Sequence, residues 1–354
     1  MSQLKKLVFS SKVIPLVLTA GLGLGVSLYV GFSKTTANPF NFNNLTAIGA
    51  IVSPINVAQA QQPTDTKVVR IGYQKYGTIN LLKAKGTLEP RLKAKGVTVE
   101  WSLFPAGPQL LEALNAGKVD FGSTGEAPPI FAQAAGAPLV YVGNEPPNPK
   151  GEAILVQKDS PIKTIRDLKG KTIALNKGSN VHYFLVKALE EAGLKYSDVK
   201  VAFLPPGDAR PAFEKGSVDA WAIWDPFYTS AKRALNARVL KDGQGLVANR
   251  EFYLAAKPIV TQHPERIKAI LEELNKVGNW AKANPKAVAE LLSPQLNIDV
   301  PSLEEISRRR PYGVQTPVKP DVVKYQQSVA DVFHKLGLIP KPIKVKDVVL
   351  NKKL

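Results

Sequence analysis

Short apolar runs alternate along residues 67–255 with segments of helical spacing. Within residues 97–104, apolar and polar positions alternate from Val97 to Leu103, which is typical of a strand with one buried face. Their apolar positions are Val97, Val99, Trp101 and Leu103. After Pro264 the apolar residues recur at the spacing of an amphipathic helix instead. Those residues are Ile267, Ile270, Leu271 and Leu274.

Because strand-like and helical segments follow one another, the pattern predicts an α/β fold whose mainly parallel sheets carry helices on both faces. The expected strands lie at residues 67–72, 97–104, 119–122, 139–143, 153–156, 171–176, 199–204, 218–224 and 251–255. The expected helices lie at residues 79–86, 88–94, 108–116, 128–135, 161–168, 181–192 and 210–215, and further helices follow residue 264.

One sequence pattern occurs twice. Pro-Ala-Gly at residues 105–107 precedes Gly-Lys-Val-Asp at 117–120, and Pro-Pro-Gly at 205–207 precedes Gly-Ser-Val-Asp at 216–219. In each copy a strand ends at Pro, a short helix follows and ends at Gly, and Val-Asp opens the next strand. The repeat predicts two similar α/β lobes with a cleft between them. The alternative is that Gly-x-Val-Asp is simply a common join between a helix and a strand.

The N-terminal segment has the features of an export leader. Residues 1–60 contain no acidic residue and four lysines, which are Lys5, Lys6, Lys12 and Lys34. Residues 13–32 are uncharged, which suits a signal sequence, and are numerous enough to span a bilayer. Ala58-Gln59-Ala60 fits a signal-peptidase site, so we expect cleavage after Ala60, with an uncleaved membrane anchor as the alternative. Either way residues 61–354 are expected outside the cytoplasm.

Composition narrows the possible functions. The chain has no cysteine, which excludes disulfides, thiolate metal sites, a cysteine nucleophile and a lipid-modified cysteine. The net charge is +18, and such a field draws anions toward a cleft; a solvated, lysine-rich surface is the alternative. Because the lysines are dispersed rather than clustered, we expect no nucleic-acid partner.

Five runs, taken in order across residues 67–340, resemble the aliphatic sulfonate-binding proteins of ABC importers. They are Arg-Ile-Gly-Tyr-Gln-Lys at 70–75, Phe-Pro-Ala-Gly-Pro-Gln at 104–109, Thr-Gly-Glu-Ala-Pro-Pro at 124–129, Asn-Lys-Gly-Ser-Asn-Val-His at 176–182 and Trp-Asp-Pro-Phe at 224–227. The wider group also binds taurine, nitrate and thiamine precursors. The runs at 124–129 and 176–182 are the most specific.

The resemblance implies a two-lobed periplasmic binding protein fold of type II, with two crossing segments, ligand capture by closure and delivery to a membrane permease. Residues 145–151 contain three prolines and are expected to approach the hinge. The predicted organisation is a leader at 1–60, a first lobe at 67–150 plus 251–340, a second lobe at 151–250 and a C-terminal tail at 341–354.

A sulfonate is a permanent anion with three acceptor oxygens and no donor, so its site must supply donors. Gly178, Ser179 and Asn180 lie where a predicted strand ends and a helix begins. Backbone N–H groups, the Ser179 hydroxyl, the Asn180 amide and the positive helix end all favour an anion there. The alternative is that Ser179 or Asn180 only caps the helix.

Thr124, Gly125 and Glu126 form the matching turn of the first lobe. Gly125 lets the backbone approach a ligand, and Thr124 can donate a hydrogen bond. Glu126 is unfavourable beside an anion, which leaves two roles open. It could bind an ammonium group on a taurine-like ligand, or hold His182 or an arginine in place.

Other candidates lie at strand and helix ends. Gln74 and Tyr76 follow the first strand as neutral donors, with a loop role and a packing role as alternatives. His182, on the first turn of the helix after Ser179, could donate to the ligand or belong to the core. Trp224 could cover an alkyl tail, and we expect Asp225 to brace a hinge.

A basic cluster late in the chain comprises Arg308, Arg309, Arg310 and the neighbouring Tyr312. We expect it to form a charged surface face, and the alternative is that one arginine reaches the cleft.

Nothing in the sequence supports catalysis or a cofactor. The three histidines, His182, His263 and His334, lack metal-ligand spacing, and Gly-x-Ser-x-Gly is absent. The sequence therefore predicts a monomeric binding protein whose partners are an organosulfonate anion and an ABC permease in the inner membrane. A taurine, nitrate or thiamine-type pyrimidine ligand, and an anchored sulfonate receptor, remain alternatives.

Overall fold

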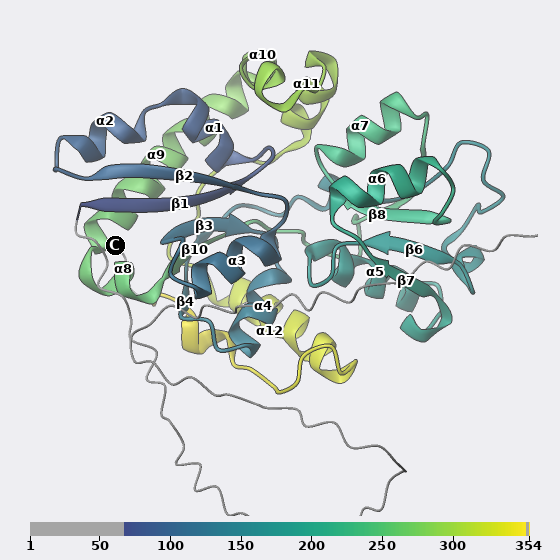
Figure 1. Ribbon diagram of the computed structural model, residues 1–354. Helices are drawn as coiled ribbons and strands as arrows, with labels where there is room; N and C mark the ends of the chain where they lie inside the picture. The colour runs from purple at the N-terminus through teal and green to yellow at the C-terminus, as the bar shows by residue number, and fades with distance from the viewer. Residues whose placement is uncertain (1–66, 352–353) are drawn as a thin grey trace, which may run out of the picture. The chain divides into compact units, whose positions relative to one another are not determined.

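Two five-stranded sheets organise residues 67–351 and 354, the part of the chain that the computed structural model describes (Figure 1). Sheet 1 has the order β2-β1-β3-β10-β4 and sheet 2 the order β7-β6-β8-β5-β9. The strands of sheet 1 are β1 (Val68–Gln74), β2 (Thr98–Phe104), β3 (Phe121–Thr124), β4 (Leu139–Asn144) and β10 (Phe252–Ala256). The strands of sheet 2 are β5 (Glu152–Val156), β6 (Thr172–Leu175), β7 (Lys200–Phe203), β8 (Ala220–Trp224) and β9 (Arg238–Asp242). The predicted leader lies outside the described residues.

Helices cover both sheets. Those associated with sheet 1 are α1 (Thr78–Lys85), α2 (Leu88–Lys93), α3 (Gly107–Asn115), α4 (Pro128–Ala134), α8 (Lys257–Gln262), α9 (Pro264–Ala283), α10 (Pro285–Leu296), α11 (Val300–Arg309) and α12 (Pro320–Lys335). Those associated with sheet 2 are α5 (Asn180–Glu191), α6 (Pro206–Glu214) and α7 (Phe227–Ala234). Short 3₁₀ turns are η1 (Pro149–Gly151), η2 (Ile165–Leu168), η3 (Tyr196–Asp198) and η4 (Val345–Val348). We call sheet 1 with its helices lobe 1, and sheet 2 with its helices lobe 2.

In each sheet four strands run in one direction and a single strand runs against them. In sheet 1, β1 runs parallel to β2 and β3, whereas β10 runs antiparallel to β3 and β4. In sheet 2, β6 runs parallel to β7 and β8, whereas β5 runs antiparallel to β8 and β9. The two antiparallel strands, β10 and β5, are the first strands after the chain crosses from the other lobe. An α/β fold with two mainly parallel sheets flanked by helices is confirmed.

The repeated Val-Asp motif has the same structural role in both lobes. The carboxylate of Asp120 accepts the backbone N–H of Arg70, and that of Asp219 accepts the backbone N–H of Thr172, each at 2.8 Å. In both copies the aspartate's own N–H donates back to the same residue at 2.8 Å. The motif therefore fixes the start of β3 against β1 and the start of β8 against β6.

The interior strand β5 is buried along its whole length because helices cover both of its faces. Ile154 and Val156 join the large core that also contains α5, whereas Ala153 and Leu155 join a smaller core beneath α6 and α7. Alternate side chains point to opposite faces of a strand, so one apolar run serves two layers.

Three local predictions need correction. The helix expected at residues 161–168 is reduced to η2, because a capping box at Thr164 and Asp167 starts the turn late. Neither α7 nor β9 was expected. Leu103, expected on a buried face, is 54% exposed near the end of β2, an edge strand of its sheet. Phe203, at the end of the edge strand β7 in the other lobe, is likewise 45% exposed.

The chain passes between the lobes twice, once between β4 and β5 and once between β9 and β10. The boundaries set at residues 150/151 and 250/251 stay predictions. The C-terminal segment packs on lobe 1: Val345 is buried, and the Leu350 N–H donates to the carbonyl of Tyr141 at 3.0 Å. The predicted C-terminal tail is thus attached beside β4 as far as residue 350.

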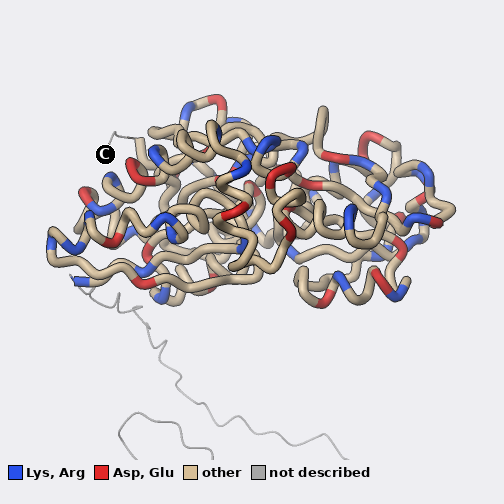
Figure 2. Tube along the Cα trace, turned by 90° about the horizontal axis from the view of Figure 1, so that it is seen from above, with Lys and Arg blue, Asp and Glu red and all other residues tan. Residues whose placement is uncertain are grey.

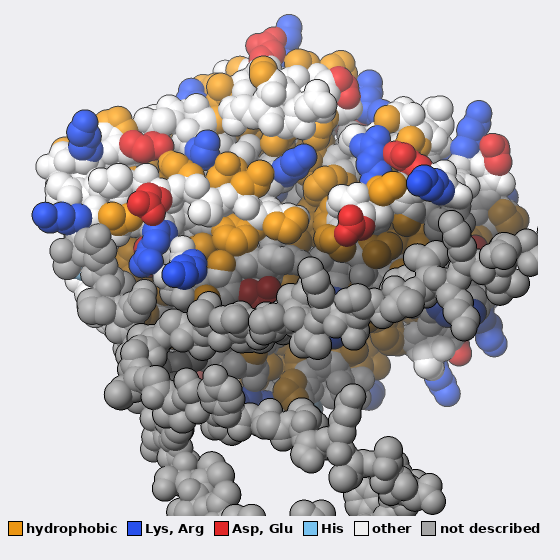
Figure 3. Space-filling model, in the orientation of Figure 1, with side chains coloured by type: hydrophobic (Ala, Val, Ile, Leu, Met, Phe, Trp, Pro, Cys, Tyr) orange, Lys and Arg blue, Asp and Glu red, His pale blue; other side chains and the backbone are white. Residues whose placement is uncertain are grey.

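Charged residues of both signs are interspersed over the described surface. Figure 2 shows Lys and Arg along both lobes, with Asp and Glu between them. On the face in Figure 3 the basic side chains likewise stand apart, with acidic and apolar groups between them. No helix among residues 67–351 is both long and apolar enough to cross a membrane.

Candidate functional site

A cavity lies between the two lobes and is lined mainly by polar groups. Its open space is about 580 Å³, part of which is continuous with solvent. Lobe 1 and the crossing segments contribute Gln74, Gly107, Gly125, Pro128, Glu145, Pro146, Asn148, Asn249, Glu251 and Arg310, and lobe 2 contributes Gly151, Ser179, Asn180, Trp224 and Asp225. Of the ten residues predicted for the site, five line this cavity: Gln74, Gly125, Ser179, Asn180 and Trp224.

The N-terminus of α5 faces the cavity. Gly178 has φ +71°, a left-handed conformation that glycine adopts without strain, and this turns the chain from β6 into the helix. Ser179 is the N-cap residue, but its hydroxyl donates to the carbonyl of Asn176 at 2.7 Å rather than capping the helix. The first N–H groups of a helix lack the partner one turn back. The His182 N–H donates to the Ser179 carbonyl at 3.0 Å, so the N–H groups of Asn180 and Val181 are the ones that can bind an anion.

The Asn180 side chain is fixed by hydrogen bonds at a point where the two lobes touch. Its Nδ2 donates to Glu152 Oε2 at 2.6 Å and to Asn249 Oδ1 at 2.8 Å. On the opposite wall, a methyl group added at Gly125 would lie 2.8 Å from the Asn180 amide carbon and oxygen. Only glycine fits at this position, because the amide of lobe 2 packs directly on the backbone of lobe 1.

Arg310 supplies the positive charge on the cavity wall. It follows α11, and only 12% of its side chain is exposed. Its Nη2 donates to Glu145 Oε2 at 2.6 Å, whereas its buried Nε has no hydrogen-bond partner among the described residues. The preferred interpretation of the arginine cluster was therefore wrong for Arg310, and the alternative that one arginine reaches the cleft is right.

Most of the acidic side chains on the cavity wall already have hydrogen-bond or ion-pair partners within the protein. Glu145 accepts hydroxyl hydrogen bonds from Thr78 and Tyr253 in addition to that from Arg310. Asp225 forms an ion pair with Arg309 at 2.6 Å. Burial raises the pKa of Glu251, which the nearby Arg310 opposes. Less negative charge therefore faces a bound anion than three carboxylates suggest.

Thr124 and Glu126 lie behind the wall. The buried Thr124 hydroxyl donates to the Gly125 carbonyl at 3.0 Å. The Glu126 carboxylate accepts the Arg250 N–H at 3.3 Å and the Tyr325 hydroxyl at 3.1 Å. Burial raises the pKa of Glu126 to about 7. Of its two possible roles, this placement favours bracing, here of the crossing segment before β10 rather than of His182.

Tyr76 and His182 are also turned away from the cavity. The Tyr76 hydroxyl bonds to that of Tyr312 at 3.0 Å behind Arg310. The His182 Nδ1 accepts the Gly178 N–H at 3.2 Å, and its Nε2 lies 2.7 Å from the Tyr196 hydroxyl. Burial, together with the charge of Lys177, lowers the pKa of His182 to about 4, so the ring is neutral at pH 7. Both side chains support the turns that carry the cavity wall.

Gln74 and Trp224 lie where the sequence placed them, at strand ends on the cavity wall. The Gln74 Nε2 donates to the Ser123 carbonyl at 3.0 Å, which leaves its second N–H free of that bond. Trp224 ends β8, half-buried, with its ring edge-on to Phe227 at 6.2 Å. It is the large aromatic surface of the cavity.

Several cavity residues were missed by sequence reasoning. Glu145 and Asn148 lie in the proline-rich segment that we assigned only to the hinge approach. Asn249 and Glu251 precede β10, and their signal was a polar run, Asn249 to Glu251, at the start of the predicted strand 251–255. No group of three or more His, Asp or Glu side chains among the described residues is placed to hold a metal ion.

Two α/β lobes joined by two crossings, with a polar cavity between them that presents a helix N-terminus and a buried arginine, define a bilobed solute-binding protein. The model of the NMT1/THI5-like family matches residues 92–288. An Escherichia coli K12 relative named for binding aliphatic sulfonates is 44% identical over 297 residues, 83% of this chain and 91% of the relative.

Solved structures agree. The alkanesulfonate-binding protein SsuA of Xanthomonas axonopodis pv. citri, bound to MOPS, is 40% identical with a TM-score of 0.76, over 80% of this chain and 98% of that one. The periplasmic aliphatic sulphonate-binding protein SsuA of Escherichia coli is 43% identical with a TM-score of 0.73, over 81% and 93%. The chain belongs to the family of aliphatic sulfonate-binding proteins.

Proposed function

We propose that this protein captures aliphatic sulfonates outside the cytoplasm and delivers them to the membrane permease of an ABC importer. The anion binds between the lobes and the alkyl tail lies against Trp224. The protein works as a monomer, without catalysis and without a cofactor. Its relatives are named as binding proteins, which supports this assignment.

One observation carries the proposal: a buried guanidinium with an unpartnered Nε and the N-terminus of α5 both line one cavity. A sulfonate offers three acceptor oxygens, so it can accept from Arg310 and from the α5 N–H groups at once. Hydrogen bonds to an ionised partner are shorter and stronger than neutral ones. A sulfonate and a guanidinium both keep their charge near neutral pH, so we expect the affinity of this site for sulfonates to change little with pH in that range.

Of the predicted site residues, three lie at the end of the cavity that binds the anion: Ser179, Asn180 and Gly125. Trp224 lies at the end that binds the alkyl tail, and Gln74 is a neutral hydrogen-bond donor on the wall. Thr124, Glu126, Gly178, His182 and Tyr76 act behind them by fixing the turns. Export is consistent with the leader at residues 1–60, for which we propose cleavage after Ala60.

Calorimetric titration tests this function. The protein is unfolded and refolded to remove carried-over ligand, and is then titrated with ethanesulfonate, taurine, sulfate and nitrate. We expect tight binding of ethanesulfonate and weak binding of sulfate and nitrate, which lack an alkyl tail. Comparing the affinity for taurine with that for ethanesulfonate shows whether an added ammonium group is favourable near Glu251. Absence of heat with ethanesulfonate, with a folded protein, would contradict the proposal.

A further inference from the structure

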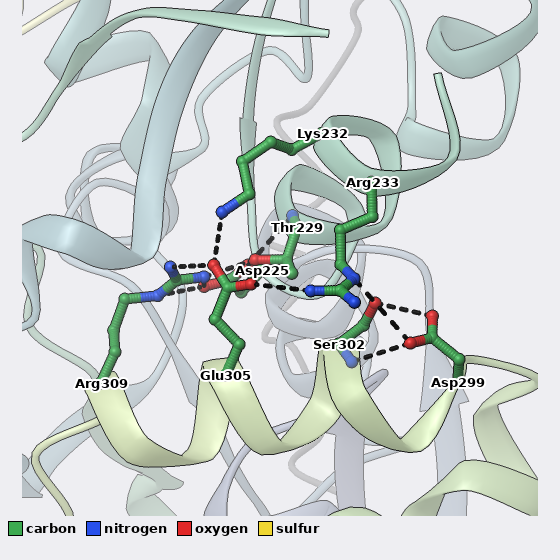
Figure 4. A network of polar contacts seen from close by, with 8 residues as sticks. All are labelled: Asp225, Thr229, Lys232, Arg233, Asp299, Ser302, Glu305 and Arg309. Carbon is green, nitrogen blue, oxygen red and sulfur yellow. Dashed lines mark hydrogen bonds and ion pairs between the residues drawn. The ribbon is translucent and has the colours of Figure 1, made fainter. Parts of the chain in front are cut away.

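A network of ion pairs joins the two lobes at one edge of the cavity (Figure 4). Its groups come from the end of β8 and from α7 in lobe 2, and from α11 in lobe 1. Helix α11 packs on α9 and α10, which in turn contact α1. Figure 1 shows α7 and α11 near each other at the top of the view, with α12 at the bottom. These ion pairs therefore require the lobes to be close together.

The centre of the network is a desolvated pair. Arg309 Nη2 and Nε lie 2.6 and 3.1 Å from Asp225 Oδ2, and the two side chains are 15% and 8% exposed. The Thr229 hydroxyl donates to Asp225 Oδ1 at 2.7 Å and accepts from Arg309. Charges removed from water in this way interact more strongly than exposed ones.

The outer part of the network is more exposed. Glu305, one turn before Arg309 on α11, accepts from Lys232, and its carboxylate lies 3.5 Å from Arg233 Nη1 and 3.4 Å from Arg309 Nη1. Arg233 Nε also lies 4.0 Å from Asp299. Since Glu305, Lys232 and Arg233 are 31–45% exposed, salt screens these contacts.

The central pair is adjacent to the cavity in both lobes. Arg309 directly precedes Arg310, and Asp225 directly follows Trp224. Arg310 and Trp224 both line the cavity. The pair therefore ties the segment that carries the proposed anion donor to the strand end that carries the proposed tail contact.

We propose that this network is a clamp that sets how long a ligand stays bound, by stabilising the arrangement in which Arg310 and Trp224 face one cavity. Contacts that exist in only one of two states shift the population toward that state. A ligand enclosed between the lobes leaves only after the network has opened. Arg309 and Asp225 are thus positioning residues, and Arg310 contacts the ligand. The part of this inference that concerns ligand release rests on the proposed binding of sulfonates.

Stopped-flow kinetics with ethanesulfonate test the effect on release. We expect Arg309→Gln and Asp225→Asn each to raise the dissociation rate roughly 5- to 150-fold, with little change in the association rate. Because both act on one pair, the double variant should resemble the single variants. Arg309→Lys, which keeps the charge, should recover part of the effect. Equal dissociation rates in wild type and both single variants would overturn the clamp's role in release.

A matched control comes from lobe 1. Arg70 forms a two-point pair with Asp120, at 3.0 Å from Nε to Oδ2 and 3.0 Å from Nη2 to Oδ1, and Asp120 is 5% exposed. Arg70→Gln breaks a similar pair that does not join the lobes, so it should leave the dissociation rate unchanged. A comparable rise in the dissociation rate of Arg70→Gln would mean that general destabilisation causes the effect, and would overturn the clamp.

Glu305→Gln, whose side chain does not line the cavity, provides a milder test should Arg309→Gln fail to fold. It should raise the rate less and reduce its dependence on salt.

A second arm needs no ligand. Since the chain has no cysteine, Lys95→Cys and Lys169→Cys place dyes on exposed sites of lobe 1 and lobe 2. Without ligand, Arg309→Gln should lengthen the distance between the dyes relative to wild type, and Arg70→Gln should not. Equal ligand-free distances in Arg309→Gln and wild type would overturn the clamp. Failure of ethanesulfonate to bind wild type would overturn the proposed function alone and leave this arm to decide the clamp.

Discussion

Replacing Arg310 tests the anion site, provided that binding is separated from folding. The guanidinium donates from Nη2 to Glu145 at 2.6 Å, its buried Nε has no hydrogen-bond partner among the described residues, and Arg310 lines the cavity. Arg310→Gln alone leaves Glu145, 3% exposed, as a buried charge without its partner, which costs about 3–5 kcal/mol of stability. The single variant therefore mixes two effects.

The double variant Arg310→Gln with Glu145→Gln separates them. Replacing both partners by neutral amides removes the uncompensated charge, so we expect most of the lost stability to return. Ethanesulfonate still loses a charge-assisted contact in a desolvated site, which is worth roughly 2–5 kcal/mol. At about 1.4 kcal/mol per factor of ten, the dissociation constant should rise by more than roughly thirtyfold.

The assay is calorimetric titration alongside urea unfolding of each variant. Arg310→Lys keeps the charge but loses the planar set of donors, so its affinity should be intermediate. Arg308→Gln is the control, because Arg308 is 63% exposed and, within the described part of the chain, pairs with Glu304 on its own helix. Wild-type affinity in the folded double variant would refute the assignment of Arg310 as the anion donor.

Three further predictions concern other residues. Gly125→Ala should weaken ligand binding at least tenfold, because its methyl group would meet Asn180 at 2.8 Å, whereas Gly207→Ala, with nothing within 4 Å, should not. Burial raises the pKa of Glu126 from 4.5 to about 7, so the folded chain holds a proton there that the unfolded chain has lost. The free energy of unfolding should therefore fall by about 3 kcal/mol between pH 4.5 and 7 from this group, and in urea titrations Glu126→Gln should lack that part of the fall. Trp224→Ala should flatten the gain in affinity from methanesulfonate to hexanesulfonate, about 0.8 kcal/mol for each buried CH₂ in wild type; an unchanged gain would place the tail elsewhere.

Repetition and periodicity in the sequence were sufficient to predict the two-lobed fold. The Pro-x-Gly and Gly-x-Val-Asp elements recur because each marks the same turn in both lobes, and Asp120 and Asp219 accept equivalent backbone N–H groups. The one reversed strand of each sheet could not be predicted, since a run of five buried residues has the same pattern whichever way the strand points. The direction of β5 and β10 depends on how the chain enters from the other lobe, which local pattern does not encode.

The sequence predicted those site residues that also mark a local structural feature, such as the start of a helix. Gly178, Ser179 and Asn180 begin a helix, so their signal was local. Arg310 lies about 130 residues further along the chain and reaches the cavity only through the packing of α11. Its sequence neighbours suggested a solvated basic face, and Arg308 does lie on one, at 63% exposure. The adjacent arginines differ because they point to different sides of the helix end.

The crystal structure of the protein with ethanesulfonate tests the central proposal most directly. Sulfonate oxygens should lie within hydrogen-bond distance of Arg310 Nε and of the first backbone N–H groups of α5, with the ethyl group toward Trp224. A sulfonate bound outside this cavity, or inside it without contact to Arg310 or the start of α5, would contradict the proposed anion site.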